Sequence, residues 1–183
     1  MIIMITRARV SGCFGSPVVA GAVLVLSAVA SAALAGALAG LAGAVLDPPL
    51  RALLALAAVT TVLVGAAFRP VPWQLDRETD TRWLDHHDWR TAAYNGIALG
   101  LGFTTRIGFW LWYVVPLSAF VVADPMLAAA GYGVFALARV GLSVLLTSAD
   151  VYIGGGIARA RLVADPLAFA ALGALYPVLA PLV

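Results

Sequence analysis

The sequence predicts an all-α, polytopic helical membrane protein, and three observations lead to this class. Hydrophobic residues make up 63% of the 183 positions and charged residues only 11%, whereas a soluble domain usually carries about 25% charged residues. The apolar runs are long, unbroken and rich in Ala and Leu, which favours helices over the alternating segments of a barrel. In lipid every backbone amide must be paired internally, as a helix allows. We therefore expect one integral membrane domain over residues 1 to 183, with the lipid bilayer as its surroundings.

The first helix is expected over residues 17 to 46, in a stretch without any charge. One crossing needs only about 20 residues. Small residues occupy every fourth position: Ala28, Ala32, Gly36, Gly40 and Ala44. Such a stripe lets helix backbones approach closely. We expect it to contact another helix or, through Ala32, Gly36 and Gly40, a second copy of the chain or a partner membrane subunit.

A second interpretation of this first segment stays open. Arginines precede it, and the sequence "AVASA" at residues 28 to 32 is typical of a signal-peptide cleavage site. The hydrophobic part of a secretory signal is usually shorter than this segment. The segment is therefore expected to be retained as a helix, with cleavage as the alternative.

An Asp-Pro pair precedes three later apolar runs, at residues 47–48, 124–125 and 165–166. Aspartate caps the free amides at a helix start, and proline is tolerated at the first helical position. We accordingly expect three more crossings, over residues 49 to 68, 125 to 147 and 166 to 183.

The remaining apolar segment, residues 91 to 123, is too long for a single crossing. Its 33 residues would extend about 50 Å as one helix, against a hydrocarbon core of about 30 Å. Either the whole segment is strongly tilted, or the crossing covers residues 103 to 123, and Pro116 should kink it. Residues 92 to 105 are expected to be broken or re-entrant, where Gly96, Gly100 and Gly102 favour a break, or to form a short sixth crossing. The prediction is five helices, or six.

The distribution of arginine predicts the orientation in a cell membrane. All eleven cationic residues are Arg, and they concentrate in the N-terminus, the 69 to 91 loop and the 150 to 165 loop. The short turns after residues 46 and 123 carry only Arg51. Since basic loops stay inside, we expect the N-terminus in the cytoplasm and the C-terminus outside. The net charge of +2 then gives no reason to expect nucleic acid.

The cytoplasmic loop at residues 69 to 91 contains the histidine pair, His86 and His87. Neighbouring side chains on a helix point about 100° apart, so the pair cannot easily hold one ion. The best metal-ligand candidates, His87 and Asp80, would need further ligands from elsewhere. We therefore expect no metal site, but a solvated collar that could dock a cytoplasmic partner through residues 69 to 90.

Known catalytic patterns are missing from the sequence. The chain has neither G-x-S-x-G nor H-E-x-x-H, and the predicted crossings lack the histidines that would hold a haem. Cys13 is the single cysteine, which excludes a disulfide within the chain. We therefore expect no cofactor, and an enzyme is disfavoured.

Two arginines inside apolar segments are the main candidates for a functional site. Arg106 lies 17 residues before Ala123, and Arg139 lies 14 residues after Pro125. In neighbouring antiparallel helices they would reach a similar depth. Charged residues inside a crossing are costly and usually face the protein interior. Two buried guanidinium groups at one level require an anion.

Helical spacing adds four polar residues to this candidate anion or lipid-headgroup site. Asn95 precedes Arg106 by about three turns, and the others lie on the stripe of Arg139. These three are Tyr132, Ser143 and Asp150. Alternatively, Arg106 extends to the membrane surface and Arg139 forms a structural pair with Asp150.

Two functions are compatible with these patterns. The first is a small, permease-like membrane protein that binds or moves an anionic or amphipathic solute or lipid between the third and fourth helices. The second is a non-catalytic subunit or assembly factor of a larger membrane complex.

Overall fold

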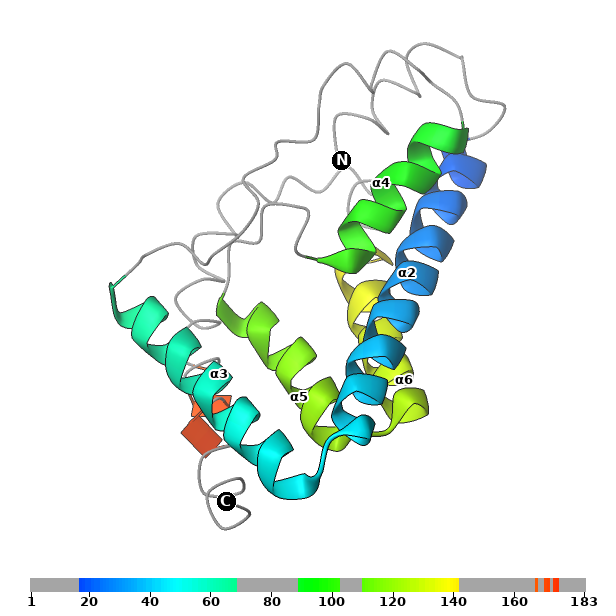
Figure 1. Ribbon diagram of the computed structural model, residues 1–183. Helices are drawn as coiled ribbons and strands as arrows, with labels where there is room; N and C mark the ends of the chain where they lie inside the picture. Colours follow the sequence, from blue (N-terminus) through cyan, green and yellow to red (C-terminus); the bar gives the residue numbers. More distant parts are fainter. Residues whose placement is uncertain are drawn as a thin grey trace. The chain divides into compact units, whose positions relative to one another are not determined.

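The computed structural model describes residues 17–68, 89–102 and 110–141, and five helical positions between residues 167 and 174. All secondary structure in these residues is helical, which confirms the all-α class for them (Figure 1). The elements are α2 (Pro17–Val45), α3 (Pro48–Phe68), α4 (Trp89–Leu101), the 3₁₀ turn η2 (Trp110–Tyr113), α5 (Val114–Val122), α6 (Pro125–Ala136) and the π-helical turn η3 (Leu137–Gly141).

Two of these helices are long and apolar enough to cross a membrane, judged by length and composition. They are α2, over Val19–Val45, and α3, over Pro48–Phe68. The apolar helix Pro125–Gly141 is shorter. The ends of α2 and α3 lie within one residue of the predicted ends. The loop before residue 89 and most of the predicted fifth crossing lie outside the described residues.

The Asp-Pro pairs at two predicted helix starts do precede helices. The carboxylate Oδ1 of Asp124 accepts hydrogen bonds from the amides of Met126 (2.8 Å) and Leu127 (3.1 Å) at the start of α6. At the start of α3, the carbonyl of Asp47 accepts the amide of Arg51 at 2.9 Å. Only two residues separate α2 from α3, and two separate α5 from α6, as the short turns of the sequence prediction require. The third pair, at residues 165–166, lies outside the described residues.

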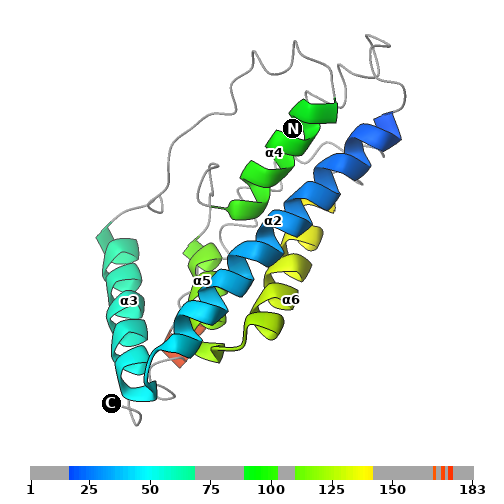
Figure 2. The same cartoon turned by 45° about the vertical axis from the view of Figure 1, so that its right-hand side comes forward.

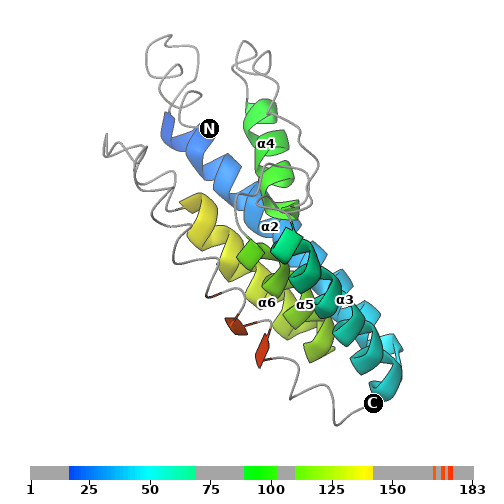
Figure 3. The same cartoon turned by 90° about the vertical axis from the view of Figure 1, so that its left-hand side faces the viewer.

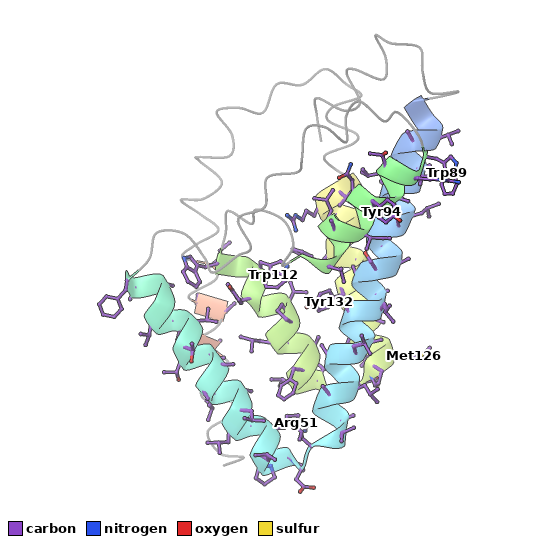
Figure 4. All side chains as sticks on the ribbon, turned by 45° about the horizontal axis from the view of Figure 1, so that its top comes forward. Arg51, Trp89, Tyr94, Trp112, Met126 and Tyr132 are labelled. Atoms are coloured by element: carbon purple, nitrogen blue, oxygen red, sulfur yellow. The ribbon has the colours of Figure 1, made fainter. Side chains whose placement is uncertain are left out.

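The side chain of Arg51 caps the C-terminal end of the preceding helix, α2. Its Nη1 donates to the carbonyl of Gly43 at 3.3 Å, and Arg51 is labelled beside the turn in Figure 4. The last carbonyls of a helix have no partner within it and carry partial negative charge. A cation from the next helix satisfies one of them here.

The chain divides into two compact units. The first comprises Met1–Ala32, Gln74–Arg106 and Gly133–Tyr152, and the second comprises Ala33–Trp73, Ile107–Tyr132 and Ile153–Val183. The described parts of the first unit are the first half of α2, all of α4 and the end of α6 with η3. The second unit contains the second half of α2, α3, η2, α5 and the start of α6.

In the first unit, α4 packs closely along α2. A Cβ atom at Gly96 would collide with Ser27 and Leu24, and one at Gly100 would collide with Ala28 and Ser31. The matched positions rise together along both helices, so α2 and α4 run parallel (Figure 2). Gly96 and Gly100, which were expected to favour a break, instead allow the backbones of α2 and α4 to approach closely.

The predicted break in the third apolar segment does occur, one residue after α4. This helix ends at Leu101, and Gly102 adopts a left-handed conformation with φ of 79°, which glycine reaches without steric cost. The next described helical residue is Trp110. Gly102 is buried, so the end of α4 is covered by the protein.

In the second unit, α2 packs on α6 through the predicted stripe. A Cβ atom at Gly36 would lie 2.8 Å from the Cβ of Tyr132, and one at Gly40 would lie 2.8 Å from the Cβ of Ala128. The residue numbers of the contacts decrease along α6 as they increase along α2, so the two helices are antiparallel, as Figure 3 shows. Gly36 and Gly40 thus contact another helix of the same chain, the first of the predicted alternatives.

One member of the predicted stripe is wrong. Ala28, Ala32, Gly36 and Gly40 are buried, but Ala44 is exposed and Gly43 is buried instead. A strict four-residue step advances about 40° too far per step on a helix of 3.6 residues per turn. A step of three from residue 40 returns the stripe to the packed face. A Cβ atom at Gly43 would collide with the carbonyl of Phe120 and lie 3.4 Å from the Cα of Ala123.

The rest of the second unit is formed by α3 against η2 and α5. Trp110 is buried against Val59 and Val62 of α3, and its ring lies 5.7 Å from that of Tyr113. Pro116 falls in the first turn of α5, where the amide it lacks has no helical partner. The kink expected at Pro116 is therefore not required, because α5 begins just before it.

The core contains small residues while the surface carries large apolar ones. Many buried positions among the described residues are Ala or Gly, and the larger buried side chains include Leu24, Trp110 and Tyr132. Exposed large residues include Leu26, Leu34, Leu38, Leu53, Phe68, Met126 and Leu137. In water, each of these would forgo about 1.5–3 kcal/mol of burial energy. Contact between small residues, with leucine outside, is the arrangement typical of helices in lipid.

The close α2–α4 contact can be tested by adding one methyl group. Gly96→Ala should lower the unfolding temperature in detergent, because the new Cβ meets backbone and the cost of overpacking is about 1–3 kcal/mol. Gly131→Ala is the matched control, since nothing lies within 4 Å of its Cβ position and alanine favours a helix. Equal melting temperatures for the two variants would contradict this packing.

Candidate functional site

Asn95 is one of the two buried polar residues identified among the described residues, the other being Thr91. It is 8% exposed and lies on the face of α4 that also carries Ala92, Gly96 and Gly100. The two glycines press this face against α2. The close helix contact explains this burial. The helical spacing that linked Asn95 to Arg106 does not hold, because α4 ends at Leu101 and Gly102 has a φ of 79°.

Arg139 lies in the π-helical turn η3, at the end of an apolar helix. The residue is half-buried, and its Nη1 atom is buried. A π-helical turn contains an i to i+5 bond and occurs frequently at functional sites. It also shifts the helical phase at Arg139 itself; the later members of the predicted stripe, Ser143 and Asp150, lie outside the described residues.

The core of the first unit brings the elements of Asn95 and Arg139 together. Ala92 of α4 and Val140 of η3 pack in one cluster with Leu24 and Ala28 of α2. Asn95 follows Ala92 by one turn, and Arg139 is the neighbour of Val140. The structure therefore places the amide-bearing and guanidinium-bearing elements around the same stretch of α2.

Two serines on α2 belong to the same surroundings. The hydroxyl of Ser31 lies 3.2 Å from the carbonyl of Ile97 on α4 and 3.1 Å from that of Ala28. The hydroxyl of Ser27 lies 2.7 Å from the carbonyl of Val23. The sequence analysis missed them, although two serines four residues apart within an uncharged run are a recognisable signal.

This arrangement has the chemistry needed to hold an anion. A guanidinium group donates two parallel hydrogen bonds to a carboxylate or phosphate, and the amide of Asn95 can donate as well. Apolar surroundings strengthen both interactions. The described residues offer no group of three His, Cys, Asp or Glu that could hold a metal ion.

Tyr132 belongs to the second unit and is 5% exposed. Its Cβ is one of the atoms that a side chain at Gly36 would meet, so the residue helps to pack α6 on α2. The other predicted site residues are Arg106, Ser143 and Asp150. Together with His87 and Asp80, the metal-ligand candidates, they lie outside the described residues.

Comparison of the chain with known protein families, with curated proteins and with solved structures finds no match.

Substitution of Tyr132 separates packing from ligand contact. If the ring acts by filling space between α6 and α2, Tyr132→Phe should keep the unfolding temperature, whereas Tyr132→Ala should destabilise the protein by about 3–5 kcal/mol. Thermal unfolding in detergent measures both. A Phe variant that is stable but has lost anion binding would instead assign Tyr132 to the ligand.

Proposed function

We propose that this chain is an integral membrane protein that binds or moves an anionic or amphipathic solute or lipid. The site lies in the first unit, between α4 and the end of α6. Arg139 is the principal anion contact and Asn95 helps to orient the ligand. On the sequence prediction, Arg106, Ser143 and Asp150 complete the site.

The distribution of side chains supports the membrane environment. Only 22% of the most apolar 18-residue stretch of α2, and 28% of that of α3, is buried. A core helix of a soluble protein would bury most of such a stretch. The exposed hydroxyls of Thr60 and Thr61 donate to the carbonyls of Leu56 (2.7 Å) and Ala57 (2.8 Å) within their own helix, so they need no water.

The length of α4 supports a site within the membrane. Thirteen residues extend about 20 Å, which is too short for a hydrocarbon core of about 30 Å. Gly100 contacts Ala28 and Ser31, and Ser31 is the middle residue of α2. A helix that ends halfway across a bilayer is tolerated where protein covers it or where it lines a cavity, and broken helices commonly form transporter binding sites.

The single observation that carries the proposal is the position of Arg139. Arg139 is half-buried at the end of an apolar helix, and its element packs against that of Asn95. A guanidinium group has five N–H donors, so it can bind a carboxylate or phosphate in addition to its contacts within the chain. The amide of Asn95 offers further donors on the neighbouring element.

Binding of decyl phosphate, a soluble amphipathic anion, tests this site. Arg139→Gln should raise the dissociation constant, measured by calorimetry in detergent, at least about tenfold. The reason is that a hydrogen bond to a charged group contributes roughly 1.5–3 kcal/mol. Arg139→Lys should retain part of the affinity. Arg51→Gln is the control, because it removes one positive charge outside the first unit.

The outcome that would overturn the site is equal affinity of the wild type and Arg139→Gln, with both proteins folded. Unfolding temperatures recorded on the same samples establish the folding. Weakening by Arg51→Gln to the same degree would indicate a general charge effect and would also contradict the assignment.

A second candidate function is a non-catalytic subunit of a larger membrane complex. The observation in its favour is the shortage of buried polar side chains among the described residues, where Thr91 and Asn95 are identified as such. A transport path needs more polar groups than these. Native mass spectrometry of gently extracted protein separates the two functions, because a stoichiometric foreign chain would favour the subunit.

A further inference from the structure

We infer that the outer face of α4 binds one phospholipid with an anionic headgroup, in the leaflet where α2 and α4 begin. The inner face of α4 is packed on α2 through Gly96 and Gly100. The outer face exposes Trp89 (60%), Tyr94 (63%) and Ile97 (41%). This inference rests on the proposed membrane environment, but it does not depend on the anion site at Arg139.

The polarity of this face changes in order along α4. Arg90, Tyr94 and Ile97 follow at steps of four and three, so they lie on one side of the helix, and all three are exposed. Tyr94 lies about 6 Å and Ile97 about 10 Å further along the axis than Arg90. A cation is thus followed by an amphipathic ring and then by an apolar side chain. A phospholipid shows the matching order of phosphate, glycerol esters and acyl chains.

The cation at the start of this face is held beside an aromatic ring. The guanidinium carbon of Arg90 lies 5.5 Å from the centre of the Trp89 ring, a cation–π distance. Trp89 points away from the helix in Figure 4. Tryptophan prefers the headgroup level of a bilayer. A planar guanidinium group restrained there is suited to bidentate binding of a phosphate.

The depth of these residues agrees with that of α2. Gly96 meets Leu24 and Ser27, and the two helices run parallel. Trp89 precedes Gly96 by seven residues. Pro17, the first residue of α2, precedes Leu24 by the same number. Trp89 and Arg90 therefore lie near the level of Pro17, where α2 begins. This is the headgroup level expected from α2.

The charge of the face selects a lipid over a partner helix. A second crossing segment would bring apolar side chains against Arg90 and leave its charge without a counterpart at the membrane surface. An anionic headgroup supplies that counterpart, and acyl chains cover Ile97 further along α4.

Competitive lipid binding tests this inference. The full chain is reconstituted in nanodiscs of equimolar phosphatidylglycerol and phosphatidylcholine, and retained lipids are counted by native mass spectrometry. We expect one phosphatidylglycerol to be retained preferentially, and Arg90→Gln to lower its occupancy roughly tenfold. Tyr94→Leu keeps the apolar surface but loses the hydroxyl, and a smaller loss is expected. Arg51→Gln should leave the occupancy unchanged.

The outcomes separate this site from the proposed anion site. Loss of phosphatidylglycerol in Arg90→Gln, with decyl phosphate binding unchanged, supports the inference. Unchanged phosphatidylglycerol in both Arg90→Gln and Tyr94→Leu overturns it, whatever Arg139→Gln does to decyl phosphate. Retention that is equal for the two lipids, or a protein chain in place of the lipid, also overturns it.

Discussion

The close approach of helix backbones through small residues is the constraint on which the described fold depends. Gly96 and Gly100 bring α4 against α2 in the first unit, and Gly36 and Gly40 bring α6 against α2 in the second. Each half of α2 thus has its own partner helix, α4 in the first unit and α6 in the second. At contacts of this kind a methyl group has no room, so the packing is set by the absence of side chains more than by their shape. Dispersion between close backbones, with local hydrogen bonds such as that of Ser31, holds the helices together.

This constraint explains where the large apolar residues and the charged residues lie. When small residues occupy the contacts, leucines such as Leu34 and Leu38 are left on the outside, an arrangement that an apolar solvent favours. The same solvent makes the half-buried Arg139 costly and therefore informative. In the proposed site, an anionic ligand would bind Arg139 and would also contact polar groups beside the packed face, above all Asn95. The fold, the environment and the proposed ligand class follow from one physical condition.

Much of the fold could be predicted from the sequence because its signals are local. Apolar length predicted α2 and α3, and the Asp-Pro pairs at residues 47–48 and 124–125 predicted where α3 and α6 begin. The exact packed face could not be predicted in full, since a four-residue repeat drifts around a helix and Gly43 replaces Ala44. The role of glycine also escaped the sequence, because a break at Gly102 and a close contact at Gly96 use the same residue type. For the site, Asn95 was linked to Arg106 by spacing on one unbroken helix, whereas its burial comes from the packing of α4 on α2. The π-helical turn around Arg139 did not, since no residue type marks it.

The most direct test of the account is the surroundings of α2 in a bilayer. Spin labels placed singly by Leu34→Cys and Leu38→Cys, two exposed positions, in a Cys13→Ser background, report their access to oxygen, which dissolves in lipid, and to a water-soluble nickel chelate. The account predicts high oxygen access and negligible nickel access at both positions. High nickel access at positions 34 and 38 would show that the leucine face meets water, and would contradict the membrane fold and the site proposed within it.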